Sequence, residues 1–159
     1  MYYLGIDPGS ASGAYAILDS EGSIVKVELF KGWKDSQNNI LQVALLPDKL
    51  IAVLEQVSGR PGERPKAVCS FCGNYMGWQS YLETSDISYT LCTPQRWQKA
   101  VLGSVPKGES KKYAVAHVSR KYGAGILIPP RCRVPHEGIA DAICIAEFCR
   151  TSHLQPTLR

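Results

Sequence analysis

The chain has 159 residues, a net charge of +4 and 45% hydrophobic residues, which suits one globular domain spanning residues 1–159. This composition excludes a disordered chain, a collagen-like repeat and a small disulfide-stapled scaffold. No apolar run approaches the ~20 residues of a membrane-spanning helix, and Met1 to Asp7 form neither a basic leader nor a cleavage site. We therefore expect no membrane partner and a reducing, cytoplasmic location.

The first thirty residues predict three antiparallel strands. Apolar runs at 2–6, 14–18 and 24–30 are separated by turn-forming residues at 8–13 and 19–22. Such a run of hairpins predicts a meander that forms one half of a sheet.

The rest of the chain predicts helices alternating with strands. We expect helices at 47–57 and 75–83 on either side of a fourth strand at 66–71, followed by a fifth strand at 87–92. Three further helices are expected: one beginning at Thr93-Pro94, one from Lys107 or Ser110 to Tyr122, and one from Pro135 to Cys149. The predicted fold class is α/β, with a mixed five-stranded sheet and helices on both faces.

Six cysteines are spread through the chain, and we expect free thiols in a reducing compartment. Cys69 and Cys72 have the spacing of half a zinc site. No second pair accompanies them, so small, buried, hydrophobic cysteines are the favoured interpretation.

Positive charge is concentrated in one segment. Residues 94–133 contain nine basic side chains and one acid, which gives a local charge of +8. A block of this kind indicates a polyanionic partner, most often nucleic acid, although a solvated helix face has the same composition. The basic residues are Arg96, Lys99, Lys107, Lys111, Lys112, Arg120, Lys121, Arg131 and Arg133.

Three carboxylates are candidates for chemistry. Asp7 follows the first strand, and Glu137 and Asp141 share one face of an otherwise apolar helix, with His136 just before them. Ordinary turn and helix-capping roles are the alternatives. If the three acids meet at one sheet edge, a divalent cation must offset their repulsion, and oxygen ligands favour Mg²⁺ or Mn²⁺. Beside a basic segment, such a cluster suits phosphodiester hydrolysis.

Four motifs together resemble the RuvC-type Holliday junction resolvases of the ribonuclease-H-like superfamily, nearest to their compact phage and plastid branch. The motifs are Gly5–Ala14, Thr93–Lys99, Lys107–Lys112 and His136–Glu147. The resemblance implies a magnesium-dependent homodimeric endonuclease that cuts four-way DNA junctions, in a bacterium or a phage-infected cell, or in an organelle if a targeting segment has been removed. A dimer would match the two-fold symmetry of a junction.

The resemblance also implies roles for individual residues. Asp7 and Asp141 would be metal ligands, Glu137 with His136 would complete the site, and Lys111 or Lys112 would lie near the scissile phosphate. The basic block also contains the candidates for DNA binding, which are Arg96, Lys99, Lys107, Lys111, Lys112, Arg131 and Arg133.

One departure from the family pattern concerns the fourth strand, which should end in a catalytic Glu. The predicted strand at 66–71 contains Cys69 and Ser70 at that place, and no acid occurs from Pro65 to Tyr81. A junction-binding protein that has lost catalysis is therefore the alternative. An ATPase or sugar kinase is a third candidate, but those enzymes need two such domains.

Aromatic residues in the second half have two interpretations. Tyr75, Trp78, Tyr81 and Trp97 could stack on unpaired bases, or they could line the core or a dimer interface. Their helical spacing favours the core or an interface.

Overall fold

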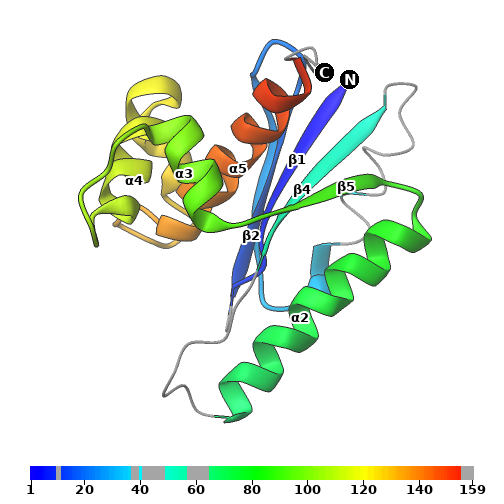
Figure 1. The fold of residues 1–159 in the computed structure, drawn as a ribbon. Coiled ribbons are helices and arrows are strands. Elements are labelled where there is room, and N and C mark those ends of the chain that lie inside the picture. The colour runs from blue at the N-terminus through cyan, green and yellow to red at the C-terminus, as the bar shows by residue number, and fades with distance from the viewer. Residues whose placement is uncertain (10–11, 37–39, 41–48, 57–64, 155–159) are drawn as a thin grey trace.

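The computed structural model describes residues 1–9, 12–36, 40, 49–56 and 65–154, which form a mixed five-stranded sheet with helices on both faces (Figure 1). This confirms the predicted fold class. The strands are β1 (Tyr2–Asp7), β2 (Gly13–Leu18), β3 (Ile24–Phe30), β4 (Leu50–Glu55) and β5 (Ser88–Cys92). The helices are α2 (Pro65–Thr84), α3 (Pro94–Leu102), α4 (Ser110–Tyr122) and α5 (Glu137–Leu154), with 3₁₀ turns η1 (Trp33–Ser36) and η2 (Ala124–Leu127).

The sheet has the order β3-β2-β1-β4-β5, and its first half is the predicted meander. β2 is antiparallel to both β1 and β3, whereas β4 is parallel to β1 and β5. The turn between β2 and β3 is closed by Asp19, whose backbone and side-chain oxygens accept hydrogen bonds from Gly22 and Ser23. The positive φ of 86° at Gly22 explains the glycine at this turn.

The predicted helix at 47–57 is wrong, because its described residues form strand β4. Leu50, Val53 and Leu54 have helical spacing, but all side chains from Leu50 to Leu54 are buried. A central parallel strand is covered on both faces, so it reads as a short continuous apolar run that periodicity cannot distinguish from a buried helix. The ends of the predicted helix, 47–48 and 57, lie outside the described residues.

The predicted strand at 66–71 is also wrong, because it belongs to the 20-residue helix α2, together with the predicted helix at 75–83. Two glycines, at 73 and 77, lie inside this helix. The ring of Trp33 occupies the place where a side chain at 77 would lie, so Gly77 permits η1 to pack against α2.

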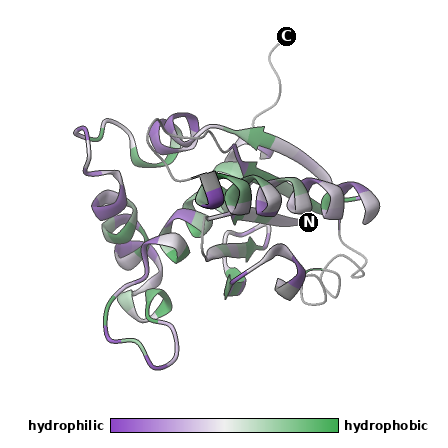
Figure 2. Ribbon diagram, turned by 90° about the horizontal axis from the view of Figure 1, so that it is seen from below, coloured by the Kyte–Doolittle hydropathy of each residue, from purple (hydrophilic) through white to green (hydrophobic). Residues whose placement is uncertain are grey.

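Two hydrophobic cores lie on the two faces of the sheet. Alternation along β1 sends Tyr3 to the core shared with α3, α4 and α5, and sends Leu4 and Ile6 to the core shared with α2. Trp78 and Tyr81 fill the α2 core and Trp97 fills the other, which confirms the core interpretation of these three aromatics. Figure 2, which is seen from below, shows α2 crossing the front of the molecule with the sheet behind it.

Helix α5 lies unusually close to strand β1. A Cβ at Gly5 would overlap the backbone nitrogen of Ala146 and the carbonyl oxygen of Ala142, and would lie 2.8 Å from the Ala146 Cα. The glycine therefore brings the helix backbone against the strand at the end of which Asp7 stands. Among the described residues, no helix is long and apolar enough to cross a bilayer.

Candidate active site

Three acids from separate elements converge at one edge of the sheet. Asp7 ends β1 and Glu55 ends the neighbouring parallel strand β4, one residue beyond the paired Ile6 and Leu54. Both occupy positions that alternate onto the α5 face, where Asp141 lies in the second turn of α5. The carboxyl ends of parallel strands are where an α/β sheet presents ligand-binding groups.

The electrostatics of these acids reflect their crowding. Burial, followed by the charges of Asp7 and Asp141, raises the pKa of Glu55 to about 8. Burial and the charge of Asp7 raise the pKa of Asp141 to about 7. Burial raises the pKa of Asp7 despite the hydrogen bond that its Oδ1 accepts from the Gly9 N–H at 3.2 Å. Near neutral pH, these acids repel one another unless positive charge compensates them.

Lys111 supplies part of that positive charge. From the first turn of α4, its Nζ lies 3.3 Å from Glu137 Oε2 and 3.6 Å from Asp141 Oδ2. Burial lowers the pKa of Lys111, but the charges of Asp141, Glu137 and Asp7 outweigh it, so the pKa is raised. The ammonium group therefore stays charged beside the acids.

Lys112 points elsewhere. Its Nζ lies 3.4 Å from Glu109 Oε2, and its side chain is 81% exposed. Of the two lysines that the sequence left as alternatives, Lys111 is the one near the carboxylates.

The start of α5 completes the cluster. Gly138 lies between His136 and Asp7, because a Cβ there would be 3.2 Å from the His136 ring and 3.4 Å from Asp7 Oδ2. The backbone N–H of His136 donates to Leu127 at 2.7 Å, and its Nδ1 is buried without a hydrogen-bond partner among the described residues. Glu137 is 57% exposed and lies at the rim.

A buried carboxylate on α5 fixes the helix that carries Lys111. Glu147 is only 5% exposed, and its two oxygens lie 2.9 Å from His117 Nε2 and 2.8 Å from Lys121 Nζ, both on α4. Burial alone would raise the pKa of Glu147, but hydrogen bonds from Lys121, His117 and Tyr122 lower it overall. Glu147 therefore joins α4 to α5 as an anion.

The donor chemistry fits a hard divalent cation. Asp7, Glu55 and Asp141 offer carboxylate oxygens, and the unpartnered Nδ1 of His136 adds a nitrogen. Within the described ranges, no three His, Cys, Asp or Glu side chains are grouped closely enough to hold an ion as they stand. Shared coordination would thus require these side chains to turn toward one another.

Glu55 is the functional candidate that the sequence reasoning missed. The expected acid at the end of the fourth strand was sought near Cys69 and Ser70, but those residues are in α2 and the fourth strand is β4. The signal was present: the run Leu50–Glu55 ends in an acid just as Tyr2–Asp7 does. The fourth strand does end in an acid, so the departure inferred from residues 66–71 rested on a wrong strand assignment.

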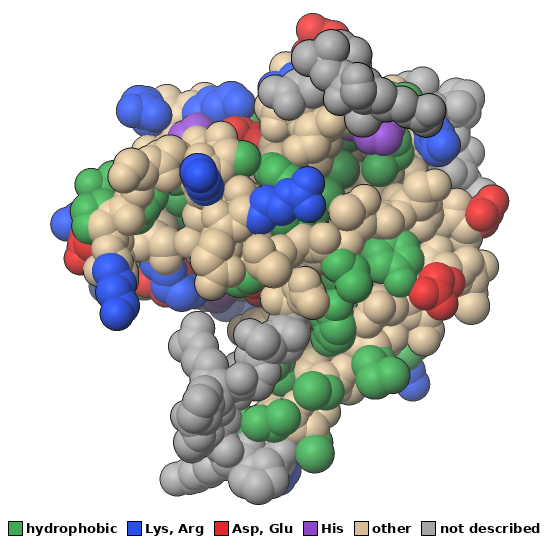
Figure 3. Space-filling view, viewed as in Figure 1, with side chains coloured by type: hydrophobic (Ala, Val, Ile, Leu, Met, Phe, Trp, Pro, Cys, Tyr) green, Lys and Arg blue, Asp and Glu red, His purple; other side chains and the backbone are tan. Residues whose placement is uncertain are grey.

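The remaining basic candidates lie on the side of α3 and α4, where Lys and Arg side chains gather on the surface (Figure 3). Lys99, Lys107, Arg131 and Arg133 are exposed. Arg96 is also exposed, but its guanidinium lies 5.8 Å from the ring centroid of Phe148, so it takes part in packing α3 on α5.

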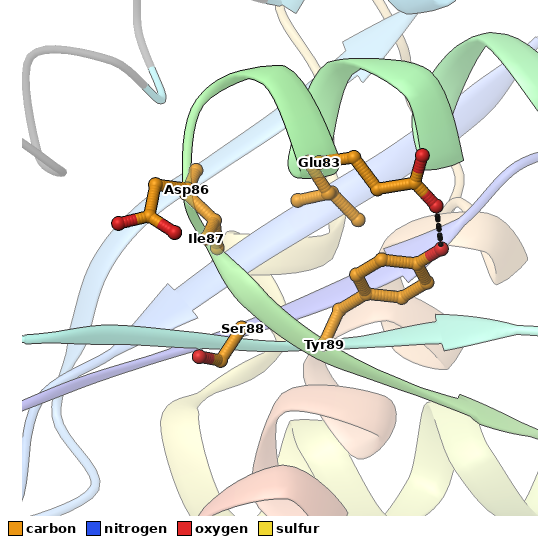
Figure 4. A pocket seen from close by; sticks show the side chains of 6 residues that line it. Glu83, Asp86, Ile87, Ser88 and Tyr89 are labelled. Atoms are coloured by element: carbon orange, nitrogen blue, oxygen red, sulfur yellow. Dashed lines mark hydrogen bonds between the residues drawn. The ribbon is translucent and has the colours of Figure 1, made fainter.

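A shallow pocket of about 370 Å³ lies elsewhere, where α2 leads into β5 (Figure 4). Its most prominent polar contact is the hydrogen bond from the Tyr89 hydroxyl to Glu83 Oε1 at 2.8 Å. Ser88 pairs with Ile51 at the opposite end of β4 from Glu55, so the pocket is separate from the acid cluster.

All six cysteines are free. Cys92, Cys144 and Cys149 are buried, whereas Cys69, Cys72 and Cys132 are exposed. The predicted free thiols are confirmed, but the expected burial is wrong for Cys69, Cys72 and Cys132.

No protein-family model matches the sequence, and no curated protein matches it significantly. Solved structures do match. RuvC from Thermus thermophilus is 19% identical, with a TM-score of 0.57 over 92% of this chain and 91% of that one. The same protein in complex with a Holliday junction substrate gives 16% identity and a TM-score of 0.61, covering 92% and 90% of the two chains. The Fowlpox virus resolvase in complex with Holliday junction DNA is 14% identical, with a TM-score of 0.58 over 98% and 100% of the chains. The chain therefore shares its fold with these RuvC and poxvirus resolvase structures.

Proposed function

We propose that this protein is a divalent-metal-dependent endonuclease that resolves four-way DNA junctions by phosphodiester hydrolysis. The observation that carries the proposal is the convergence of Asp7, Glu55 and Asp141, from three elements, beside the charged Lys111. The junction as substrate is supported by the matching Thermus and Fowlpox structures, both of which contain Holliday junction DNA.

Asp7, Glu55 and Asp141 would hold Mg²⁺ or Mn²⁺, with His136 and Glu137 beside them. A divalent ion bound there supplies an activated water and stabilises the leaving oxygen. Lys111 is 57% exposed at its side chain, so its ammonium can leave the carboxylates and pair with a phosphate oxygen at the cleaved bond. Lys99, Lys107, Lys112, Arg131 and Arg133, with Arg96 at the edge of α3, would hold the DNA backbone.

We further propose that the protein acts as a homodimer, which would place two equivalent sites on a two-fold symmetric junction. The first half of α2 supports this arrangement. None of its described side chains from Lys66 to Gly77 is buried, Lys66 is its one charged residue, and Met76 is 65% exposed. The molar mass in solution, measured by light scattering, tests the dimer. A DNA substrate and free cysteines favour a reducing compartment that contains DNA, such as the cytoplasm or an organelle.

The test is cleavage of a labelled four-way junction with Mg²⁺ or Mn²⁺. Loss of a residue that only supports a metal ligand slows a metalloenzyme by roughly 10–100-fold. Loss of a ligand itself should cost more, so cleavage should slow by more than that in each of Asp7→Asn, Glu55→Gln and Asp141→Asn. Glu21→Gln, in the exposed turn between β2 and β3, is the matched control and should cut normally.

A binding protein without catalysis is the alternative function. Its premise was a missing acid on the fourth strand, and Glu55 now stands there. Tight junction binding with equally poor cleavage by wild type and Asp7→Asn would nevertheless favour this alternative.

A further inference from the structure

The Thr93–Lys99 motif places a tryptophan over the candidate site. Trp97 is completely buried in the first turn and a half of α3, and its indole Nε1–H donates a hydrogen bond of 2.7 Å to Glu55 Oε1. The two residues are 42 positions apart in the chain. Trp97 therefore contacts the acid that ends β4.

The local backbone explains how Trp97 reaches Glu55. Cys92, the last residue of β5, pairs with Glu55, and the Gln56 N–H donates to the Cys92 carbonyl at 2.7 Å. Pro94 then starts α3 at once, with its fixed φ suited to a first helical turn. The short path from β5 into α3 thus carries the indole back over the end of β4.

The chemistry of the pair is directional. An indole is a hydrogen-bond donor only, so Trp97 binds one carboxylate oxygen and cannot act as a ligand itself. The hydrogen bond engages Oε1 and restricts the rotation of the carboxylate, while Oε2 is not used by Trp97. An outer partner of this kind orients a ligand and commonly affects metal affinity by about 10–100-fold.

We propose that Trp97 is a positioning residue, which holds the Glu55 carboxylate in the orientation that the divalent-metal site requires. This inference rests on the proposed function, because it assigns Glu55 to that site. Base stacking and core packing do not require the hydrogen bond from the Trp97 indole to Glu55, whereas a positioning role does.

The chain contains a matched control. Trp78 is also completely buried, but its Nε1 has no hydrogen-bond partner within the described part of the chain. Trp97→Phe and Trp78→Phe therefore remove the same atoms from two cores, and only the first removes a hydrogen bond to Glu55.

The primary readout is Mn²⁺ affinity without DNA, measured by calorimetry or electron paramagnetic resonance. Trp97→Phe should weaken Mn²⁺ binding by roughly 10–100-fold, whereas Trp78→Phe should stay within about two-fold of wild type, since it leaves the acids alone. In single-turnover cleavage, Trp97→Phe should regain rate as the metal concentration rises. Equal Mn²⁺ affinities in the two variants would overturn the proposal.

A second measurement covers the case in which Trp97→Phe does not fold. The chain has three tryptophans, so a ¹⁵N spectrum resolves their indole N–H groups individually. Glu55→Gln should shift the Trp97 indole resonance and leave the Trp78 resonance in place, and an unmoved Trp97 resonance would overturn the proposal. Absence of Mn²⁺ binding and cleavage in wild type would instead refute the proposed function, while the indole shift would still report on the hydrogen bond.

Discussion

Replacing Glu147 by glutamine should destabilise the protein and loosen the helix that carries Lys111. An amide has one acceptor oxygen and one donor nitrogen, but Glu147 meets donors at both oxygens, on His117 and Lys121. Glutamine offers an acceptor to one of the two partners only. It keeps the other contact only where the His117 nitrogen accepts instead of donating, and in either case the negative charge is lost.

The magnitude follows from the exposure of the two partners. His117 is 19% exposed at its side chain and its contact is well shielded, so loss of that charge-assisted hydrogen bond should cost about 1.5–3 kcal/mol. Lys121 is 40% exposed, and solvent screening limits its contribution to about 0–1 kcal/mol. With both contacts weakened, we expect a total of about 1.5–4 kcal/mol, which corresponds to a fall in Tm of roughly 3–16 °C for a chain of this size.

The effect should also depend on pH, with a defined sign. The pKa of Glu147 is lower in the folded state than its usual value of 4.5, so its stabilising contribution is complete above about pH 5. The contribution is lost as pH falls through the lowered native pKa. The difference in unfolding free energy between wild type and Glu147→Gln should therefore shrink in strong acid.

Urea denaturation followed by circular dichroism, from pH 7 down to pH 3, measures this difference directly. Glu83→Gln, at an exposed acid that accepts a hydrogen bond from Tyr89, serves as control and should change stability by less than about 0.5 kcal/mol. A Glu147→Gln effect as small as the control, or one constant across the pH range, would refute the reasoning.

Three further predictions follow from the fold and the charges. Gly5→Ala should destabilise the protein by more than the ~1–3 kcal/mol of ordinary overpacking, because the new methyl group meets the α5 backbone; a near-neutral urea midpoint would contradict the close packing. Asp141→Asn should raise the Tm at pH 8 without metal. The raised pKa means that ionisation of Asp141 destabilises the fold progressively as pH rises from about 4 to about 7. The gain in Tm should therefore disappear at pH 4, and an equal gain at both pH values would argue against this reasoning. Removing Arg131 and Arg133 together should reduce the slope of log affinity for a junction against log salt by about 1.8, as measured by fluorescence anisotropy, and an unchanged slope would show that neither contacts phosphate.

The sequence was most informative where local chemistry alone determines the structure. The Asp19–Gly22 turn and the short apolar runs on either side of it required no tertiary information, and the meander was predicted correctly. Asp7 and Asp141 were identified as candidate site residues because acids stand out at a strand end and in an apolar helix. The structure brings them into electrostatic contact, as expected.

The errors occurred where tertiary context decides. β4 is buried on both faces, so its apolar run has no alternation that would separate strand from helix. That single misassignment concealed Glu55 and created the apparent absence of a catalytic acid. The choice between Lys111 and Lys112 was likewise beyond sequence reasoning, because it depends on how α4 is rotated against α5, and Glu147 contributes to that rotation.

The contact at Gly5 has a consequence for how the site tolerates evolutionary change. At Gly5 the backbone of β1 contacts the backbone of α5 directly. No side chain therefore lies between the two elements that carry Asp7 and Asp141. Drift among the surrounding apolar residues can therefore alter the volume of the core while the distance between the two acids stays nearly constant. This offers one physical route by which chains that share less than a fifth of their residues can retain one fold.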